Sequence, residues 1–175
     1  MSETNNSKRV QKLIEELGSR DERKVIGALK RVPHEGSAEI IIPMLHLLAK
    51  DPSSEIQLLL QNSLYNLKDP NALEPLIAAL RDKQLKGIRS HVLTCIWQSG
   101  LDASAELDLL INIAVEDDFM CAVEVLTIVD NTEHYSDDLL SGNIKKLDKA
   151  INEQADKAAL LGNLRQVLLD KLLDE

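Results

Sequence analysis

The chain has 175 residues, of which 44% are hydrophobic and only 2% aromatic, and its formal net charge is −9. This length suits a single domain. No run of eighteen apolar residues occurs, and the first eleven residues, MSETNNSKRVQ, lack the apolar core of a signal peptide. We therefore expect a cytoplasmic protein without a membrane span.

The charges are unevenly distributed along the chain. Residues 90–144 contain no Lys or Arg but eleven Asp and Glu, whereas residues 8–31 contain eight Lys and Arg against four acids. The acids can simply serve solubility and helix capping. They can also form an acidic surface that attracts a basic protein. A third interpretation is head-to-tail self-association, with residues 8–31 of one chain meeting residues 102–138 of another.

In chain order, residues 1–7 are polar and are expected to be disordered. Residues 8–17 have the periodicity of one helix, ended by Gly18. A first helix pair is expected near 21–32 and 38–50, with Ser37 as a cap.

The next stretch, 51–84, is the most regular. Ile56, Leu60 and Leu64 are spaced as one helical face, and a second stripe follows with Leu73, Leu76, Ile77 and Leu80. Between the two lies Lys68-Asp69-Pro70-Asn71, in which Asn71 and Glu74 fit a capping box. Pro75 falls in the first turn of the second helix, where its missing N–H costs least. This stretch therefore predicts two short helices and a tight turn.

Similar pairs flank this stretch at a spacing of just over thirty residues. Met44, Leu45 and Leu48 match Leu76, Ile77 and Leu80, and a third pair is expected over 85–115. A fourth pair starts at Asp117, and its first helix fades near Asn131. Pairs of this size cannot close a core alone, so stacked copies are expected.

The remainder is irregular. Residues 131–138 read as a polar loop, and Ser141-Gly142-Asn143 is expected to interrupt the following helix. Residues 156–173 predict a long amphipathic helix. We interpret residues 131–175 as a terminal cap, with pairing to a second copy as the alternative.

The pattern Asp-Pro-x-x-x-Ile…Leu-x-x-Leu-x-Asp-Pro…Leu-x-Pro-Leu-Ile-x-x-Leu in residues 51–80 resembles the HEAT-repeat family, bacterial type. The resemblance covers roughly residues 8–130. It implies an all-α fold, a short right-handed α-solenoid of about four helix pairs with a helical C-terminal cap, as one domain over 8–175.

In that family the second helix of each pair lines a concave face that commonly holds partners. Applied to this chain, the resemblance implies an exposed set of partner-binding candidates on these helices: His46, Lys50, Arg81, Asn112 and Glu116. We add Asp117 and Asp118 from the acidic stretch as further candidates.

No catalytic or cofactor motif is present: the chain lacks GxSxG, GxGxxG and Walker-type loops. His91, Cys95, Cys121 and Glu124 are residue types that can bind zinc, but both cysteines lie on apolar stripes and form no CxxC. We expect Cys95 and Cys121 to be reduced and packed in the core, and a disulfide between them is the alternative. We expect no bound metal ion.

The expected function is a non-enzymatic scaffold or adaptor that binds a protein with a basic surface. Nucleic acid is not expected because phosphate binding needs Lys and Arg. Membrane binding is not expected either, and the chain should be a monomer or weakly self-associating. The alternative that the resemblance implies is a HEAT-like enzyme, such as a DNA-repair glycosylase or a bilin lyase. The acidic charge and the missing catalytic motif speak against it.

Overall fold

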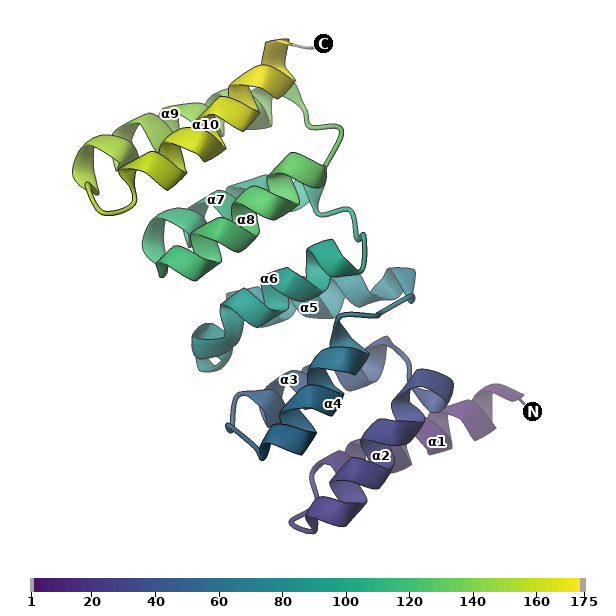
Figure 1. Cartoon of the computed structure of the whole chain (residues 1–175). Helices are drawn as coiled ribbons and strands as arrows, with labels where there is room; N and C mark the ends of the chain where they lie inside the picture. Colours follow the sequence, from purple (N-terminus) through teal and green to yellow (C-terminus); the bar gives the residue numbers. More distant parts are fainter. Residues whose placement is uncertain (1, 174–175) are drawn as a thin grey trace. The chain divides into compact units, whose positions relative to one another are not determined.

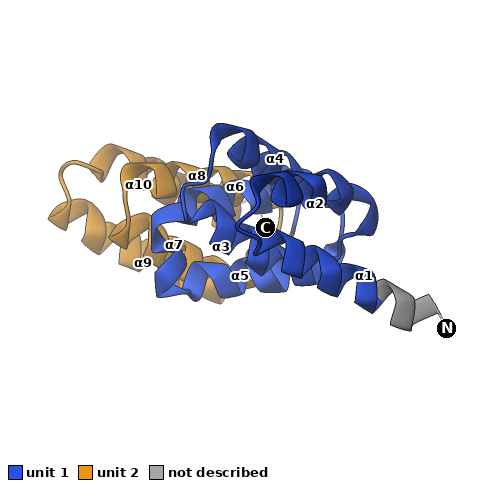
Figure 2. Cartoon of the chain, turned by 90° about the horizontal axis from the view of Figure 1, so that it is seen from below, with its two compact units in different colours: residues 1–101 blue, residues 102–175 orange. Residues whose placement is uncertain are grey.

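The computed structural model describes residues 2–173, with side chains from residue 7 onward, and every regular element within that range is a helix. The all-α prediction is confirmed. The contacts group the chain into two compact units, residues 1–101 (unit 1) and 102–175 (unit 2), shown in Figure 2. Within the described range, no helix combines the length and the apolarity that crossing a bilayer requires.

Unit 1 contains six α-helices and three short 3-10 turns (Figure 1). The α-helices are α1 (Ser2–Leu17), α2 (Glu22–Glu35), α3 (Ile41–Leu48), α4 (Ser54–Leu64), α5 (Leu73–Arg81) and α6 (Arg89–Gln98). The 3-10 turns are η1 (Ala38–Ile40), η2 (Pro70–Ala72) and η3 (Lys83–Ile88). Helix α1 packs against α2 and α3, α2 against α4, α3 against α4 and α5, and α5 against α6.

Unit 2 contains two helical hairpins. Its elements are η4 (Ser104–Glu106), α7 (Leu107–Glu116), α8 (Phe119–Asn131), α9 (Asp137–Glu153) and α10 (Ala158–Leu173). Helix α7 pairs with α8 and α9 with α10, while α7 contacts α9 and α8 contacts α10. The two hairpins therefore lie side by side, with α8 and α10 on the same side (Figure 1).

Helix α1 begins at Ser2 rather than at Lys8, so most of the segment expected to be disordered is helical. No Gly or Pro occurs between Ser2 and Leu17, and nothing in the sequence therefore stops the helix upstream of Lys8. At its other end the Gly18 N–H donates to the Ile14 carbonyl at 3.2 Å, which closes the last turn.

Aspartates cap several of the helices. Asp21 accepts from the Arg23 N–H at 3.0 Å, and Asp118, not Asp117, accepts from the Cys121 N–H at 2.9 Å. Each side chain satisfies one of the N–H groups that a helix start leaves without a partner.

The turn at residues 68–71 is capped differently from the expectation. The carboxylate of Asp69 accepts from the Asn71 N–H and from its side-chain amide, both at 2.9 Å. Asp69 therefore starts η2, and α5 follows with Pro75 in its first turn. The expected capping box at Asn71 gives way because the chain begins to turn two residues earlier.

The expected interruption at Ser141-Gly142-Asn143 is wrong, because α9 continues through it from Asp137 to Glu153. One Gly inside a helix costs only about 1 kcal/mol relative to Ala. Burial of Leu140, Ile144 and Leu147 on one face offsets that cost. Asn143 is itself fully buried, and its amide donates to the Leu139 carbonyl at 2.9 Å within the same helix.

The core is aliphatic, as the composition predicts, and both cysteines belong to it as free thiols. Burial raises the pKa of Cys95 to about 12, so its reactive thiolate form is disfavoured. Tyr135 is the one buried aromatic side chain among the described residues, and burial raises its pKa to about 12 as well.

Candidate partner-binding surface

Three of the seven candidate residues lie in unit 1. His46 is half-buried on α3, Lys50 is exposed just beyond the end of that helix, and Arg81 is exposed at the last residue of α5. Helices α3 and α5 pack against each other, so these residues belong to adjacent elements. The large apolar side chains that are most exposed in the described residues are Leu58, Phe119, Met120 and Leu173. None of them lies on α3 or α5.

The other four candidates lie in unit 2. Asn112 and Glu116 are exposed one turn apart on α7, and Asp117 and Asp118 form the turn between α7 and α8. Asn112 is already engaged, because the Lys146 ammonium on α9 donates to its side-chain oxygen at 2.8 Å. Asp118 has the capping role described above. Asp117 is half-buried, so Glu116 and Asp118 are the exposed acids of this group.

The two units differ strongly in charge. Unit 1 has 14 Lys and Arg against 12 Asp and Glu, a net charge of +2, whereas unit 2 has 6 against 17, a net charge of −11. The acidic character of the chain therefore belongs to unit 2. A field of one sign attracts partners of the opposite sign and speeds their association.

Lys157 lies in the turn between α9 and α10, is only 7% exposed, and holds the end of α7. Its ammonium donates to the backbone carbonyls of Ala114 at 3.1 Å, Val115 at 2.6 Å and Asp117 at 2.8 Å. These bonds satisfy carbonyls at a helix C-terminus, where the helix dipole also favours a positive charge. The α9–α10 turn is thereby fixed beside the α7–α8 turn.

Lys171 binds backbone carbonyls at the C-terminal end of α8 in the same way. Its ammonium donates to the carbonyls of Asp130 at 3.2 Å and Thr132 at 2.8 Å, just where α8 ends. Arg165 pairs with Asp148, and Lys146 lies 3.5 Å from Asp108. Most of the few cations of unit 2 are therefore engaged within the unit, and the 17 acids still exceed the six cations by eleven charges.

Helix α8 has two exposed apolar residues at its start. Phe119 and Met120 are each 54% exposed, whereas Cys121 and Val125 on the opposite face are buried. Sequence reasoning missed this pair, although a signal was available. The buried stripe was read correctly from Cys121 and Val125, and neither Phe119 nor Met120 lies on it.

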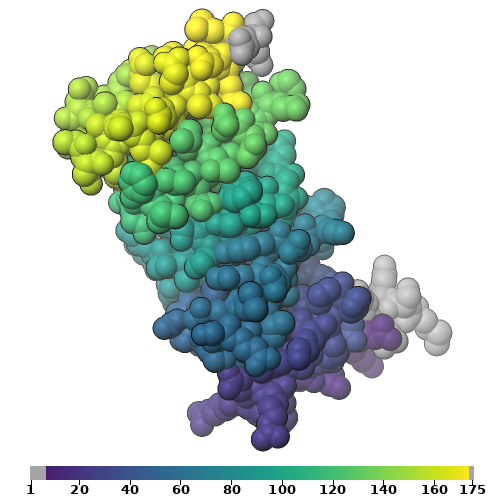
Figure 3. All heavy atoms as spheres, viewed as in Figure 1, coloured from purple at the N-terminus to yellow at the C-terminus, as the bar shows by residue number. Residues whose placement is uncertain are grey.

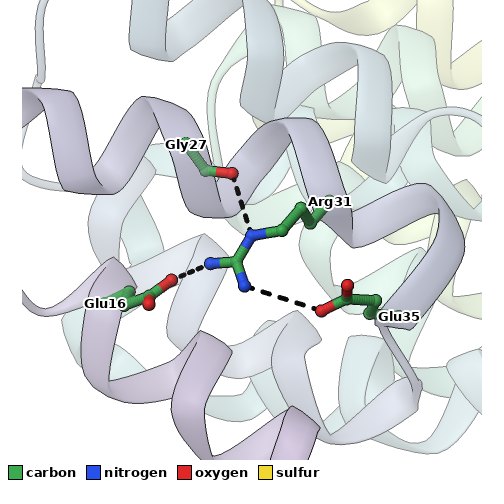
Figure 4. Close-up of polar contacts among 4 residues, drawn as sticks. All are labelled: Glu16, Gly27, Arg31 and Glu35. Carbon is green, nitrogen blue, oxygen red and sulfur yellow. Dashed lines mark hydrogen bonds and ion pairs between the residues drawn. The ribbon is translucent and has the colours of Figure 1, made fainter.

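In contrast to the acidic unit 2, unit 1 has many positively charged side chains on α1 and α2. The Arg31 guanidinium on α2 pairs with Glu16 of α1, donates to the Gly27 carbonyl at 3.2 Å and lies 3.6 Å from Glu35 (Figure 4). Several other cations of this helix pair are exposed: Lys8, Arg9, Lys12, Arg20, Arg23, Lys24 and Lys30. The exposed cations of the basic stretch therefore lie on α1, on α2 and in the loop between them, and we call this set the basic surface.

Two hollows lie on unit 1. One, of about 470 Å³, is lined by residues that include Val32, Ser37, Asn66 and Asp69. The other, of about 310 Å³, has a mixed lining that includes Leu48, Asp51, Gln57 and His91. The Nδ1 atom of His91 lies 2.7 Å from the Tyr65 hydroxyl, and this hydrogen bond orients the imidazole.

The four residues weighed as zinc ligands do not form a metal site. Among the described residues, no group of three or more His, Cys, Asp or Glu side chains is arranged to hold a metal ion. His91 is instead oriented by its hydrogen bond to Tyr65, and Cys95 and Cys121 are packed in the core.

Comparisons of the chain with protein-family models, with curated proteins and with solved structures found no significant match.

Proposed function

We propose that this chain is a non-enzymatic protein-binding module, an adaptor or scaffold, and that unit 2 attracts a positively charged protein segment. The proposed framework is a short α-solenoid of HEAT-like helix pairs, in which α9 and α10 close the C-terminal end. The resemblance of residues 51–80 to HEAT repeats and the pairwise packing of helices within each unit support that framework.

The observation that carries the proposal is the charge of unit 2. Its net charge is −11 with all six Lys and Arg counted, including Lys157 and Lys171, whose ammonium groups bind backbone carbonyls. A surface of this kind attracts Lys- and Arg-rich segments and repels phosphates. The acidic turn at Asp117 and Asp118 is part of it.

The proposal is tested by selecting peptides from a random display library on the immobilised full chain. We expect the enriched peptides to contain an excess of Lys and Arg, and their recovery to fall between about 50 mM and 500 mM salt, since screening weakens exposed charge pairs. Enrichment of neutral or acidic peptides, or none above a blank surface, would contradict the proposal.

A matched pair of variants locates the effect. The triple variant Glu116→Gln, Asp130→Asn, Asp156→Asn removes three exposed charges from unit 2. Its control, Glu39→Gln, Glu55→Gln, Glu74→Gln, removes three exposed charges from unit 1. We expect several-fold weaker binding of a selected peptide by the first variant and little change by the second. Equal losses in both would assign the effect to net charge alone.

A further inference from the structure

The outward side of α8 presents an apolar stripe. Phe119 and Met120 are each 54% exposed, and Val123 and Thr127 continue the stripe at half exposure, at spacings of four residues from Phe119. Thr127 donates its hydroxyl to the Val123 carbonyl at 3.0 Å, so it presents its methyl group without an unsatisfied donor. Helices α8 (green) and α10 (yellow) form the visible face of unit 2 in Figure 3.

Single exposed apolar residues are ordinary on a protein surface, but adjacent ones at a helix start are not. Four large apolar side chains are strongly exposed in the described part of the chain, namely Leu58, Phe119, Met120 and Leu173. Only Phe119 and Met120 are neighbours. Leu58 lies on α4 of unit 1, and Leu173 is the last described residue of α10. The α8 stripe is therefore the place where two of these four side chains are adjacent.

Acidic side chains surround this stripe. Asp118 and Asp130 are exposed at its two ends, and Glu116 lies at the end of the preceding helix. Lys157 fixes the α9–α10 turn beside the α7–α8 turn, which brings the exposed Asp156 to the same edge. The ammonium of Lys157 is buried on backbone carbonyls, and its charge is already counted in the net charge of −11 of unit 2.

We propose that the outward face of α8 docks a basic amphipathic helix of a partner protein. Phe119, Met120 and Val123 would contact its apolar stripe, and the acids at both ends would pair with Lys or Arg that flank that stripe. The distance from Asp118 to Asp130 corresponds to about 18 Å along a helix, or a little over three turns of a partner helix. This inference rests on the proposed function and specifies its partner.

A second copy of the chain is a poorer occupant for this face. Its basic surface lies on α1 and α2, and neither helix has any of the strongly exposed large apolar side chains of the described residues. Docking of that surface would match the charge but would place Phe119 and Met120 against polar groups. A partner that is both basic and apolar matches both features of α8.

The test uses two dye-labelled peptides of equal length and equal positive charge, measured by fluorescence anisotropy with the full chain. One has Leu at positions i, i+3, i+4 and i+7 between Lys and Arg residues, and the other has Gln in place of each Leu. We expect the wild-type chain to bind the Leu peptide at least about tenfold more tightly, since buried apolar anchors dominate such interfaces.

Two variants assign the preference to α8. Phe119→Gln together with Met120→Gln should remove the preference for the Leu peptide while leaving salt-dependent binding of both peptides. Leu58→Gln, at a side chain 58% exposed on α4, is the matched control and should retain the preference. Circular dichroism and the thermal midpoint check that each variant is folded.

The outcomes separate the two proposals. If neither peptide binds the wild-type chain at low salt, the proposed function fails. If both bind equally, or if the Phe119 and Met120 variant keeps its preference, the docking inference fails and the proposed function stands. Concentration-dependent self-association in light scattering, abolished by the same variant, would make a second copy the occupant and would also overturn the inference.

Discussion

The two units are built from the same kind of helix, but the contacts between turns inside each unit use different charged groups, a carboxylate in unit 1 and ammonium groups in unit 2. In unit 1 the carboxylate of Asp69 in one turn accepts from the Ala38 N–H in another at 3.2 Å, so an acid joins two helix starts. In unit 2 the ammonium groups of Lys157 and Lys171 join turns by binding carbonyls at two helix ends. Carboxylates satisfy helix N-termini and ammonium groups satisfy C-termini, so both solutions follow from the helix dipole.

The difference has a consequence for the surface. In unit 1, Asp69 joins two turns and Arg31 pairs α2 with α1, while the other cations of these two helices are exposed. Unit 2 has only six cations and places two of them on backbone carbonyls. The charge contrast itself comes from the composition of the two units, and packing decides which cations are exposed. Four predictions test this comparison.

The largest effect is expected for Lys157→Met. The variant keeps the apolar length of the side chain but leaves the carbonyls of Ala114, Val115 and Asp117 without their donor. Loss of a buried charged donor of this kind should destabilise unit 2 by about 2 to 3 kcal/mol. Hydrogen exchange with mass spectrometry should show faster exchange in peptides from α7, α9 and α10 and unchanged exchange in unit 1.

The control for that change is Lys145→Met, at an exposed position of α9. Its exchange profile should match the wild type. Equal effects of both substitutions, or slow exchange retained in α7 after Lys157→Met, would show that the lysine tie does not stabilise unit 2.

A smaller effect is expected for Asp69→Ala in unit 1, at about 1 to 2 kcal/mol, because the cap of η2 and the bond to Ala38 are both lost. Asp82→Ala is the matched control. Asp82 caps η3 through the Gln84 N–H at 2.8 Å. If the hydrogen bond from Ala38 to Asp69 stabilises unit 1, Asp69→Ala should lower the hydrogen-exchange protection of unit 1 more than Asp82→Ala does. Equal losses of protection would show that Asp69 acts only as the cap of its own turn.

The same carboxylate predicts a pH dependence for unit 1. Hydrogen bonds, chiefly from the Asn71 N–H, lower the pKa of Asp69 below its ordinary value of 3.8. The ionised form is therefore favoured in the folded state. Its stabilisation is present above pH 3.8 and is lost as the pH falls through the lowered pKa. Asp69→Asn should flatten this part of the stability profile of unit 1, whereas a profile that stays unchanged would exclude Asp69 as its source.

The smallest effect is a gain in stability from Gly142→Ala. Gly142 lies inside α9, and an added Cβ would meet no atom within 4 Å. The change should stabilise unit 2 by about 0.5 to 1 kcal/mol. Gly27→Ala is the control in unit 1, since a Cβ at that position of α2 is equally unobstructed. Each change should slow exchange only in its own unit, and a gain spread over both units would mean that they unfold together.

The sequence by itself determined most of the helices and the charge contrast. Apolar spacing located the buried faces of α4, α5, α6 and α8 because one helical face repeats at three and four residues whatever its neighbours are. The absence of Lys and Arg from residues 90–144 also needed no structure. Misjudged positions, such as the interruption at Gly142, arose where burial outweighed a weak local preference.

Only the tertiary structure decided how the charges and apolar residues of unit 2 are used. Lys157 reaches carbonyls about forty residues away in the sequence, and no local pattern distinguishes it from the exposed Lys145. The exposure of Phe119 and Met120 likewise depends on which faces of α8 the other helices cover. Local spacing identifies the face a helix buries, whereas the groups beside its exposed face are fixed by packing between distant parts of the chain.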